Sequence, residues 1–173
     1  DLDLIKTFPN VQVSFSINTL DESFKNDMDC ASSIADRLDA MKKFYEAGIY
    51  TTCFISPIFP EITDCLAIIE KCKNFCNSIW LENLNLRGEY KPVILNYISK
   101  KYPHLLPLYK DIYNKNDRTY WINLNQKITE YCLKNNMPYK RENKIINSDF
   151  GTPPTVINFF YHEEIKKSAQ KNT

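Results

Sequence analysis

The sequence has almost no net charge, only two histidines and no long apolar run. Its 22 Lys and Arg residues against 21 Asp and Glu residues give a formal charge of +1, so no overall field favours nucleic acid or an anionic membrane. No stretch approaches the roughly 18 apolar residues of a membrane-spanning helix. The acidic start, DLDLIKTFPN, lacks the apolar segment of a signal peptide, and we expect a cytoplasmic protein.

The scarcity of histidine limits the chemistry that the sequence offers. His104, between Pro103 and two leucines, is typical of a turn residue, and His162 is a minor candidate for a general base. We find no Ser–His–Asp arrangement, no phosphate-binding glycine loop and no zinc-ligand spacing. We therefore assign no catalytic residue and no metal ligand within this chain.

Six cysteines raise the question of disulfides or a metal centre. Cys65, Cys72 and Cys76 lie on one face of a predicted helix, a pattern typical of small buried side chains in a reducing compartment. Cys72 and Cys76 form a C-x3-C pair, but Ile79 occupies the position of the third cysteine of an iron–sulfur triad. We therefore predict core cysteines.

The sequence does contain a strand–helix–strand unit. Residues 11–19 alternate between apolar and polar side chains, which indicates a strand. Residues 33–47 place an apolar stripe on a helix that Ser32 or Ser33 can cap and Gly48 can end. Residues 49–55 are β-branched and aromatic, and this second strand is expected to end at Ser56-Pro57. Such a connection is almost always parallel.

Further elements are predicted along the rest of the chain. They are helices over 64–77, which Asp64 can cap, and over 91–101, 105–113 and 117–135, strands over 79–86 and 155–161, a loop over 137–150, and a helix tail before residue 11. In the long helix, Trp121, Leu124, Ile128 and Leu133 are expected to be buried. The order of elements indicates an α/β sheet or barrel over residues 1–90, and residues 91–173 a helical extension with a late strand packed on it.

Polar side chains gather near the carboxyl ends of the predicted strands, where parallel α/β folds bind ligands. They are Ser16, Asn18, Thr19, Ser56, Glu82, Asn83 and Asn85. A polar interior costs free energy unless it is hydrogen-bonded, so three such strands favour a site for a polar ligand. The alternative for the first strand is a polar face that meets water, as in an edge strand.

Two charged residues have open interpretations. Glu82 either accepts hydrogen bonds from a ligand or makes a structural pair with Arg87 or a lysine. Arg37 either clamps a ligand carboxylate or joins an exposed ion-pair patch with Asp36 and Asp39. The basic and aromatic residues of segment 87–113 either bind single-stranded nucleic acid or lay lysine stems over a core.

Several stretches resemble a known family. VSFSINTLDE, ASSIADRLDAMKKFYEAGI and TTCFISPIFPEITD are similar to the second half of a radical S-adenosylmethionine (SAM) domain, most closely in spore photoproduct lyase-like proteins. WLENLNLRGEYK, DRTYW and VINFFYHEEIKKSA resemble the subgroup called radical SAM mobile pair protein B. The similarity extends from about Val11 to Ala169.

The resemblance implies the C-terminal portion of a partial (β/α)6 TIM-type barrel, with three or more parallel strands and a helical C-terminal extension. Residues 1–90 would form its last three βα units. In the family, a [4Fe–4S] cluster on a C-x3-C-x2-C triad cleaves SAM to a radical that abstracts a hydrogen atom from the substrate.

The resemblance also implies site residues. On the first strand, the next helix and the second strand, it assigns SAM contacts to Ser14, Ser16, Asn18, Arg37, Phe54 and Ser56. The first three would meet the ribose and methionine part, Arg37 a carboxylate, and the last two the adenine. Glu82, Asn83 and Asn85, on the last barrel strand, would contact substrate or SAM.

The chain departs from the family because it lacks the cysteine triad, the strands before it and the glycine-glutamate motif for the methionine amine. We therefore expect a fragment of a longer enzyme, inactive alone, with SAM and the cluster bound in the full-length parent and neither bound tightly by this chain. Its open sheet edge would pair with the missing amino-terminal half or a second copy. The substrate is unknown, and a DNA lesion is suggested only by the relatives. The alternative is a non-catalytic α/β module that binds a partner chain or nucleic acid, without membrane contact.

Overall fold

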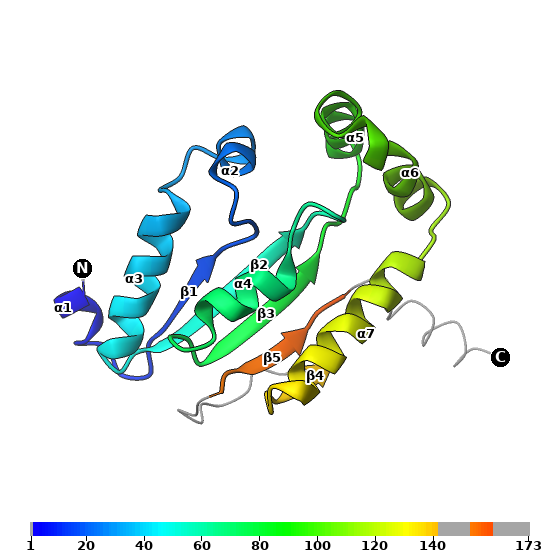
Figure 1. Cartoon of the computed structure of the whole chain (residues 1–173). Coiled ribbons are helices and arrows are strands. Elements are labelled where there is room, and N and C mark those ends of the chain that lie inside the picture. The colour runs from blue at the N-terminus through cyan, green and yellow to red at the C-terminus, as the bar shows by residue number, and fades with distance from the viewer. Residues whose placement is uncertain (1, 142–152, 161–173) are drawn as a thin grey trace.

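A computed structural model describes residues 2–141 and 153–160 (Figure 1). The helices are α1 (Leu2–Ile5), α2 (Glu22–Met28), α3 (Ile34–Glu46), α4 (Cys65–Cys72), α5 (Tyr90–Lys101), the short 3-10 helix η1 (Pro103–Leu105), α6 (Leu106–Asn114) and α7 (Thr119–Lys134). The strands are β1 (Gln12–Ser16), β2 (Tyr50–Ile58), β3 (Ser78–Asn83), β4 (Tyr139–Arg141) and β5 (Thr155–Asn158). Within the described ranges, no helix has the length and apolar character to span a membrane.

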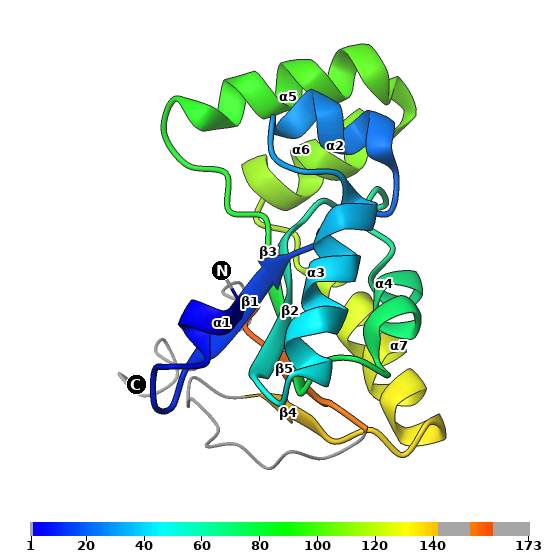
Figure 2. The ribbon, with the colours of Figure 1, turned by 90° about the vertical axis from the view of Figure 1, so that its left-hand side faces the viewer.

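The strands form one parallel sheet in the order β1-β2-β3-β5-β4. Helices α3, α4 and α7 cover one of its faces (Figures 1 and 2). Helices α2, α5 and α6 lie beyond the carboxyl ends of the strands. The predicted α/β class and the parallel pairing of the first three strands are thus confirmed. The late strand β5 joins the same sheet, beside β3.

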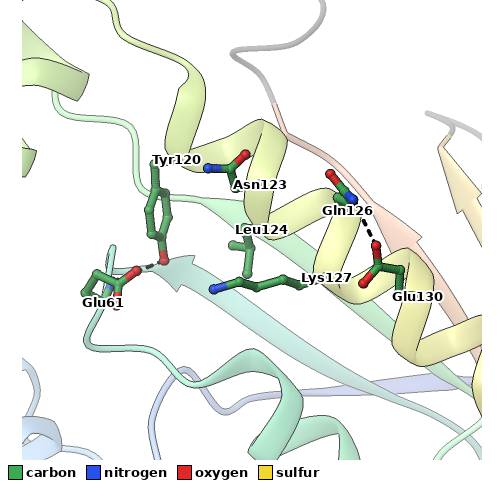
Figure 3. A pocket seen from close by; sticks show the side chains of 7 residues that line it. All are labelled: Glu61, Tyr120, Asn123, Leu124, Gln126, Lys127 and Glu130. Carbon is green, nitrogen blue, oxygen red and sulfur yellow. Dashed lines mark hydrogen bonds between the residues drawn. The ribbon is translucent and has the colours of Figure 1, made fainter.

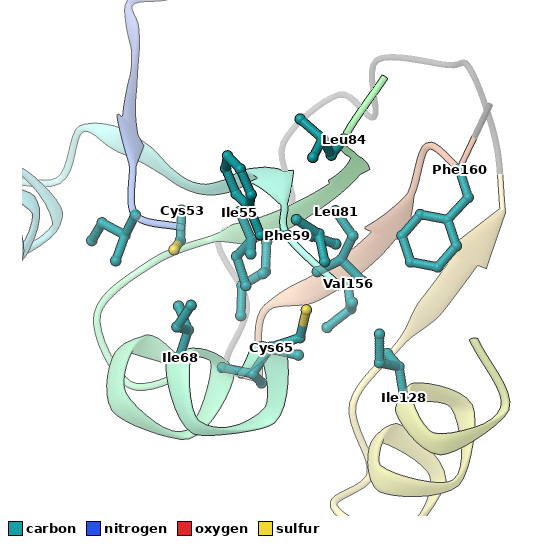
Figure 4. Packing of buried hydrophobic residues seen from close by; sticks show 14 of the residues in the cluster. Cys53, Ile55, Phe59, Cys65, Ile68, Leu81, Leu84, Ile128, Val156 and Phe160 are labelled. Atoms are coloured by element: carbon teal, nitrogen blue, oxygen red, sulfur yellow. The ribbon is translucent and has the colours of Figure 1, made fainter. Parts of the chain in front are cut away.

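The core lies between the sheet and its covering helices (Figure 4). Cys53 and Ile55 of β2 and Leu81 of β3 are inaccessible to solvent, and Ile68 of α4 packs with them. Burial of these aliphatic side chains is the main force that holds helices and sheet together.

The three cysteines predicted to be buried belong to this core, whereas Cys30 is exposed. Cys65, Cys72 and Cys76 are at most 2% exposed. On α7, burial raises the pKa of the Cys132 thiol to about 11, so that this thiol stays neutral at physiological pH. In residues 2–141 and 153–160, no group of three or more His, Cys, Asp or Glu side chains is arranged to hold a metal ion.

The predicted caps at the amino ends of α3 and α4 are confirmed by their hydrogen bonds. The Ser33 hydroxyl accepts from the Asp36 N–H at 3.1 Å and caps α3. The Asp64 carboxylate accepts from the Ala67 N–H at 2.9 Å and caps α4. Gly48, which follows α3, has φ +77°, a backbone conformation that glycine adopts without strain.

Several predicted boundaries are wrong. The first strand ends at Ser16, because Asp21 caps the unpredicted helix α2 by accepting from the Ser23 and Phe24 N–H groups. Strand β2 continues through a cis Ser56–Pro57 bond to Ile58. The helix predicted over 64–77 ends at Cys72, and the strand predicted over 79–86 ends at Asn83.

Other corrections concern the C-terminal part. Strand β4 lies in the segment predicted to be a loop, because it pairs with β5. Leu133 is 73% exposed instead of buried, since it lies on the side of α7 opposite the core. His104 is exposed in η1, in keeping with a turn residue, whereas His162 falls outside the described residues.

Candidate functional site

The sheet has a second face, opposite α3, α4 and α7, which we call the far face. On β1, Phe15 turns toward α3 and contacts Phe44 at 5.8 Å between ring centroids. Because side chains alternate along a strand, Ser14 and Ser16 lie on the far face. The same alternation places Phe54 and Trp80 there, between the core positions of β2 and β3.

Side chains of β2 and β3 form three successive cross-strand pairs on the far face. At the amino end, the Thr52 and Ser78 hydroxyls share a buried hydrogen bond of 2.8 Å. In the middle, Phe54 and Trp80 make an edge-to-face contact with centroids 6.1 Å apart. At the carboxyl end, the Ser56 hydroxyl donates to the Glu82 carboxylate at 2.6 Å. The polarity of the face therefore changes along the strands, from hydroxyls to aromatics to a carboxylate.

The structure thus brings together three of the residues assigned from the sequence. Phe54, Ser56 and Glu82 are half-buried neighbours on the far face. The hydrogen bond from Ser56 means that Glu82 has at least one structural partner.

Ser14 and Ser16 extend the same face onto β1. Their register partners are Thr52 and Phe54, so they are the next residues across the sheet. Both are exposed, and β1 is an edge of the described sheet. This is the arrangement of the edge-strand alternative, in which the polar side chains meet water.

Arg37 serves the backbone around it. Its guanidinium donates to the Ser32 carbonyl at 3.0 Å, the Ser16 carbonyl at 3.1 Å and the Asp29 carboxylate at 2.8 Å. Its side chain is only 12% exposed. The ion-pair partner is therefore Asp29, and not the predicted Asp36 or Asp39. These contacts fasten the connection between β1 and α3 to the end of β1.

The contact with Arg37 affects the pKa of the Asp29 carboxyl. Its partial burial raises the pKa, but the Ala31 N–H and the Arg37 guanidinium outweigh burial and hold the pKa below its usual value. Asp29 is thus ionised at neutral pH and completes the fastening of the loop.

The three assigned asparagines do not share the far face. Asn18 is half-buried in the connection after β1. Asn83 is 2% exposed and, by alternation with Glu82, lies on the helix-covered side. Asn85 lies beyond β3, where its carbonyl oxygen accepts from the Arg87 Nε at 3.0 Å.

Sequence reasoning missed Trp80 and Phe159. Their rings contact each other with centroids 5.2 Å apart, and they extend the aromatic row of Phe54 to the residue that follows β5. The indole N–H of Trp80 is buried, and none of the described residues accepts a hydrogen bond from it. The spacing of Trp80 two residues before Glu82 on one strand was the signal for a shared face.

The basic and aromatic segment partly serves the fold. Lys91 donates to the Tyr113 carbonyl at 2.6 Å. Tyr97 donates to Asp27 of α2 at 2.8 Å, and Lys101 pairs with the same carboxylate at 3.3 Å. The first contact joins α5 to α6 and the other two join α5 to α2, beyond the strand ends. Tyr90 remains half-exposed at the start of α5.

Comparison with known proteins gives one relative to report. A curated protein of Methanocaldococcus jannaschii, named only as uncharacterized protein MJ0683, is 39% identical over 106 residues. The alignment covers 60% of this chain but only 39% of that protein. No protein-family model matches the chain. No solved structure matches it either.

The far face combines stacking surfaces with hydrogen-bonding groups. Aromatic rings offer stacking surfaces, and the Trp80 N–H requires an acceptor, since buried donors without a partner are rare in folded proteins. At the strand ends, a carboxylate and hydroxyls offer hydrogen bonds to ligand hydroxyl or amino groups. This combination matches the two parts of a nucleoside.

Proposed function

We propose that this chain is the C-terminal portion of a radical SAM enzyme of the spore photoproduct lyase-like type. Its sheet would form part of a partial (β/α)6 barrel, with the far face turned to the barrel interior. The parent enzyme would abstract a hydrogen atom from an unidentified substrate. The observation that carries the proposal is the pairing of Phe54 with Trp80 and of Ser56 with Glu82 on one face of parallel strands.

Two further observations support the proposal. The strands run parallel and carry helices on one face, as each barrel segment of this type does. The alignment covers only 39% of the relative's length, which is compatible with a longer parent. The family itself is inferred from the sequence motifs.

The residues present fit one of the two family cofactors. SAM carries an adenine, a ribose and an amino acid, and the rings and polar groups of the far face suit the first two. Phe54 and Trp80 would hold the adenine, while Ser16, Ser56 and Glu82 would hold the ribose and exclude water. When bound in the parent, SAM supplies the radical chemistry.

The second cofactor does not fit this chain. No metal-holding group of His, Cys, Asp or Glu side chains is present among residues 2–141 and 153–160. Cys53, Cys65, Cys72 and Cys76 are in the core, at most 2% exposed. The [4Fe–4S] cluster would therefore have to be held elsewhere in the parent, and we derive no step through it.

The edge of β1 is where the rest of the barrel would attach. One side of its backbone pairs with β2, and the other side has no strand partner in the described sheet. Open edges tend to recruit another strand. The amino-terminal half of the parent is the partner that would extend the sheet and the far face together.

Binding of SAM to this chain tests the proposal. Trp80 lies on the far face, whereas Trp121 is fully buried within the helical layer, so a Trp121→Phe variant reports on Trp80 alone. In this background, SAM should quench the fluorescence with a Kd in the range of about 1 mM, because half of the site is missing. Glu82→Gln should weaken binding about tenfold. Ser99→Ala, at an exposed position of α5, is the control.

Absence of quenching, or unchanged affinity in Glu82→Gln, would contradict the far-face site.

The gene provides a second test that separates the proposal from a non-catalytic module. The reading frame before Asp1 should encode a C-x3-C-x2-C triad, and its absence would favour the module. In the longer protein, reconstituted anaerobically with iron and sulfide, reduction should release deoxyadenosine from SAM.

A further inference from the structure

A groove separates the loop after β2 from helix α7 (Figure 3). It consists of two adjoining cavities of about 330 and 280 Å³, which share Glu61, Tyr120, Leu124 and Lys127. A cavity of this size is sufficient for a small molecule. The groove lies on the helix-covered side of the sheet, so it is separate from the far face and does not depend on the function proposed above.

The loop wall of the groove is fixed by its own hydrogen bonds. Glu61 has φ +58°, a left-handed conformation that is uncommon for glutamate. The Ile62 and Thr63 N–H groups both donate to the Phe59 carbonyl, at 3.1 and 2.9 Å. The Glu61 N–H donates to the Tyr120 hydroxyl at 3.1 Å. The turn therefore holds its shape, and α7 contributes directly to it.

The helix wall is equally well anchored. Tyr120, Leu124 and Lys127 follow each other at steps of four and three, which places them on one side of α7. On the adjoining side, Trp121 and Ile128 are completely buried in the core. Figure 3 shows Tyr120 and Lys127 reaching from α7 toward Glu61. The groove therefore has two preformed walls with polar groups on both.

Two groups on α7 are available to an oxyanion. The Tyr120 oxygen accepts from the Glu61 N–H, and in the described part of the chain its O–H donates to no other group. Burial raises the pKa of this phenol, so it stays a donor at neutral pH. The ammonium of Lys127 has no carboxylate within 4 Å in residues 2–141 and 153–160.

The remaining groups decide which anion fits. The carboxylates of Glu61 and Asp64 line the groove and would repel a doubly charged phosphate. A ligand with a carboxylate next to a cationic group can pair with both walls, because the helix wall carries Tyr120 and Lys127 and the loop wall carries Glu61. Leu124 adds an aliphatic surface between them. We propose that this groove binds a small aliphatic α-amino acid as a zwitterion, with its carboxylate on Tyr120 and Lys127 and its ammonium on Glu61.

Calorimetric titration of the chain with L-leucine tests the proposal. 4-Methylpentanoate and isoamylamine, which are leucine without its amine and without its carboxylate, keep the aliphatic body and one charged group each, so they should bind at least about tenfold more weakly. Lys127→Gln should weaken leucine binding about tenfold, because a charged hydrogen bond is lost. Lys134→Gln, at an exposed position outside the groove on the same helix, should leave it unchanged.

A second variant tests the assignment of the ammonium. Glu61→Gln should reduce the preference for leucine over 4-methylpentanoate, because the attraction for the ammonium and part of the repulsion of a lone carboxylate disappear with the charge. Glu61 and Lys127 are exposed, so both variants should melt at the temperature of the parent chain. Three outcomes overturn the proposal: no heat from leucine at millimolar concentration, equal binding of the three probes, or unchanged leucine affinity in Lys127→Gln.

Discussion

The two faces of the sheet are built for different purposes. Toward the helices, Ile79 and Leu81 of β3 are fully buried with aliphatic neighbours. On the far face, their neighbours in sequence, Trp80 and Glu82, are half-buried and meet an aromatic ring and a hydroxyl. One strand thus alternates between residues that stabilise the fold and residues suited to a ligand. We therefore expect substitutions on the helix-covered face to lower the free energy of unfolding more than substitutions on the far face.

The largest expected effect separates the two faces directly. Leu81→Ala should lower the free energy of unfolding by about 3 kcal/mol, because it leaves a cavity in a fully buried site. Ser14→Ala on the far face should change it by less than about 0.5 kcal/mol. Urea denaturation measures both values. Similar losses in the two variants would show that the faces do not differ in this way.

An intermediate effect is expected where the carboxyl end of β1 meets the loop before α3. Arg37→Gln removes charge-assisted hydrogen bonds to Ser16, Ser32 and Asp29, and should cost about 2 kcal/mol. Lys42→Gln, which removes only an exposed ion pair on α3, should cost less than about 0.5 kcal/mol. If both variants were equally stable, Arg37 would not fasten the loop.

The stability lost in Arg37→Gln should depend on pH. The pKa of Asp29 is lower in the folded chain than in the unfolded one, where it is about 3.9. Its ionised form therefore stabilises the fold above about pH 5, and this contribution is lost as the pH falls through the folded pKa. The difference in stability between the wild-type chain and Arg37→Gln should shrink between about pH 5 and pH 3. A difference that stays constant would exclude Asp29 as the partner that matters.

The smallest expected loss of stability concerns the hydrogen bond between Ser56 and Glu82 on the far face. Ser56→Ala removes one hydrogen bond to the half-buried Glu82 carboxylate and should cost about 1 kcal/mol. The loss is small because water can replace the hydroxyl at a partly exposed site. Chemical denaturation beside Ser14→Ala provides the measurement. A loss as large as that of Leu81→Ala would mean that the Ser56–Glu82 pair is a structural element of the fold.

Much of the fold was predictable because local signals agreed with the global arrangement. Ser33, Gly48 and Asp64 are capping residues, and each one caps or ends a helix as expected. Helix α2 was missed because it has only seven residues and its apolar positions show no clear stripe, although Asp21 was a readable cap. Leu133 was misplaced because apolar character alone does not say which side of a helix faces the core.

The candidate site was less predictable than the fold. Alternation along β2 and β3 was enough to place Ser56 and Glu82 on one face, and they are hydrogen-bonded there. Neither interpretation of Arg37 included its backbone partners, because a sequence does not show the carbonyls that a folded loop presents to a side chain. The groove beside Glu61 was not foreseen, since it depends on Tyr120, which is 59 residues further along the chain.

The loops at the carboxyl ends of β2 and β3 are held by tyrosines from distant helices. Tyr109 donates to the Pro60 carbonyl at 3.2 Å, Tyr113 donates to the Leu84 carbonyl at 3.0 Å, and Tyr120 accepts from Glu61. Residues 59–63 are therefore held both by hydrogen bonds within the loop and by tyrosines outside it. A graft of this loop into another scaffold would lose the tyrosine contacts unless α6 and the start of α7 were included.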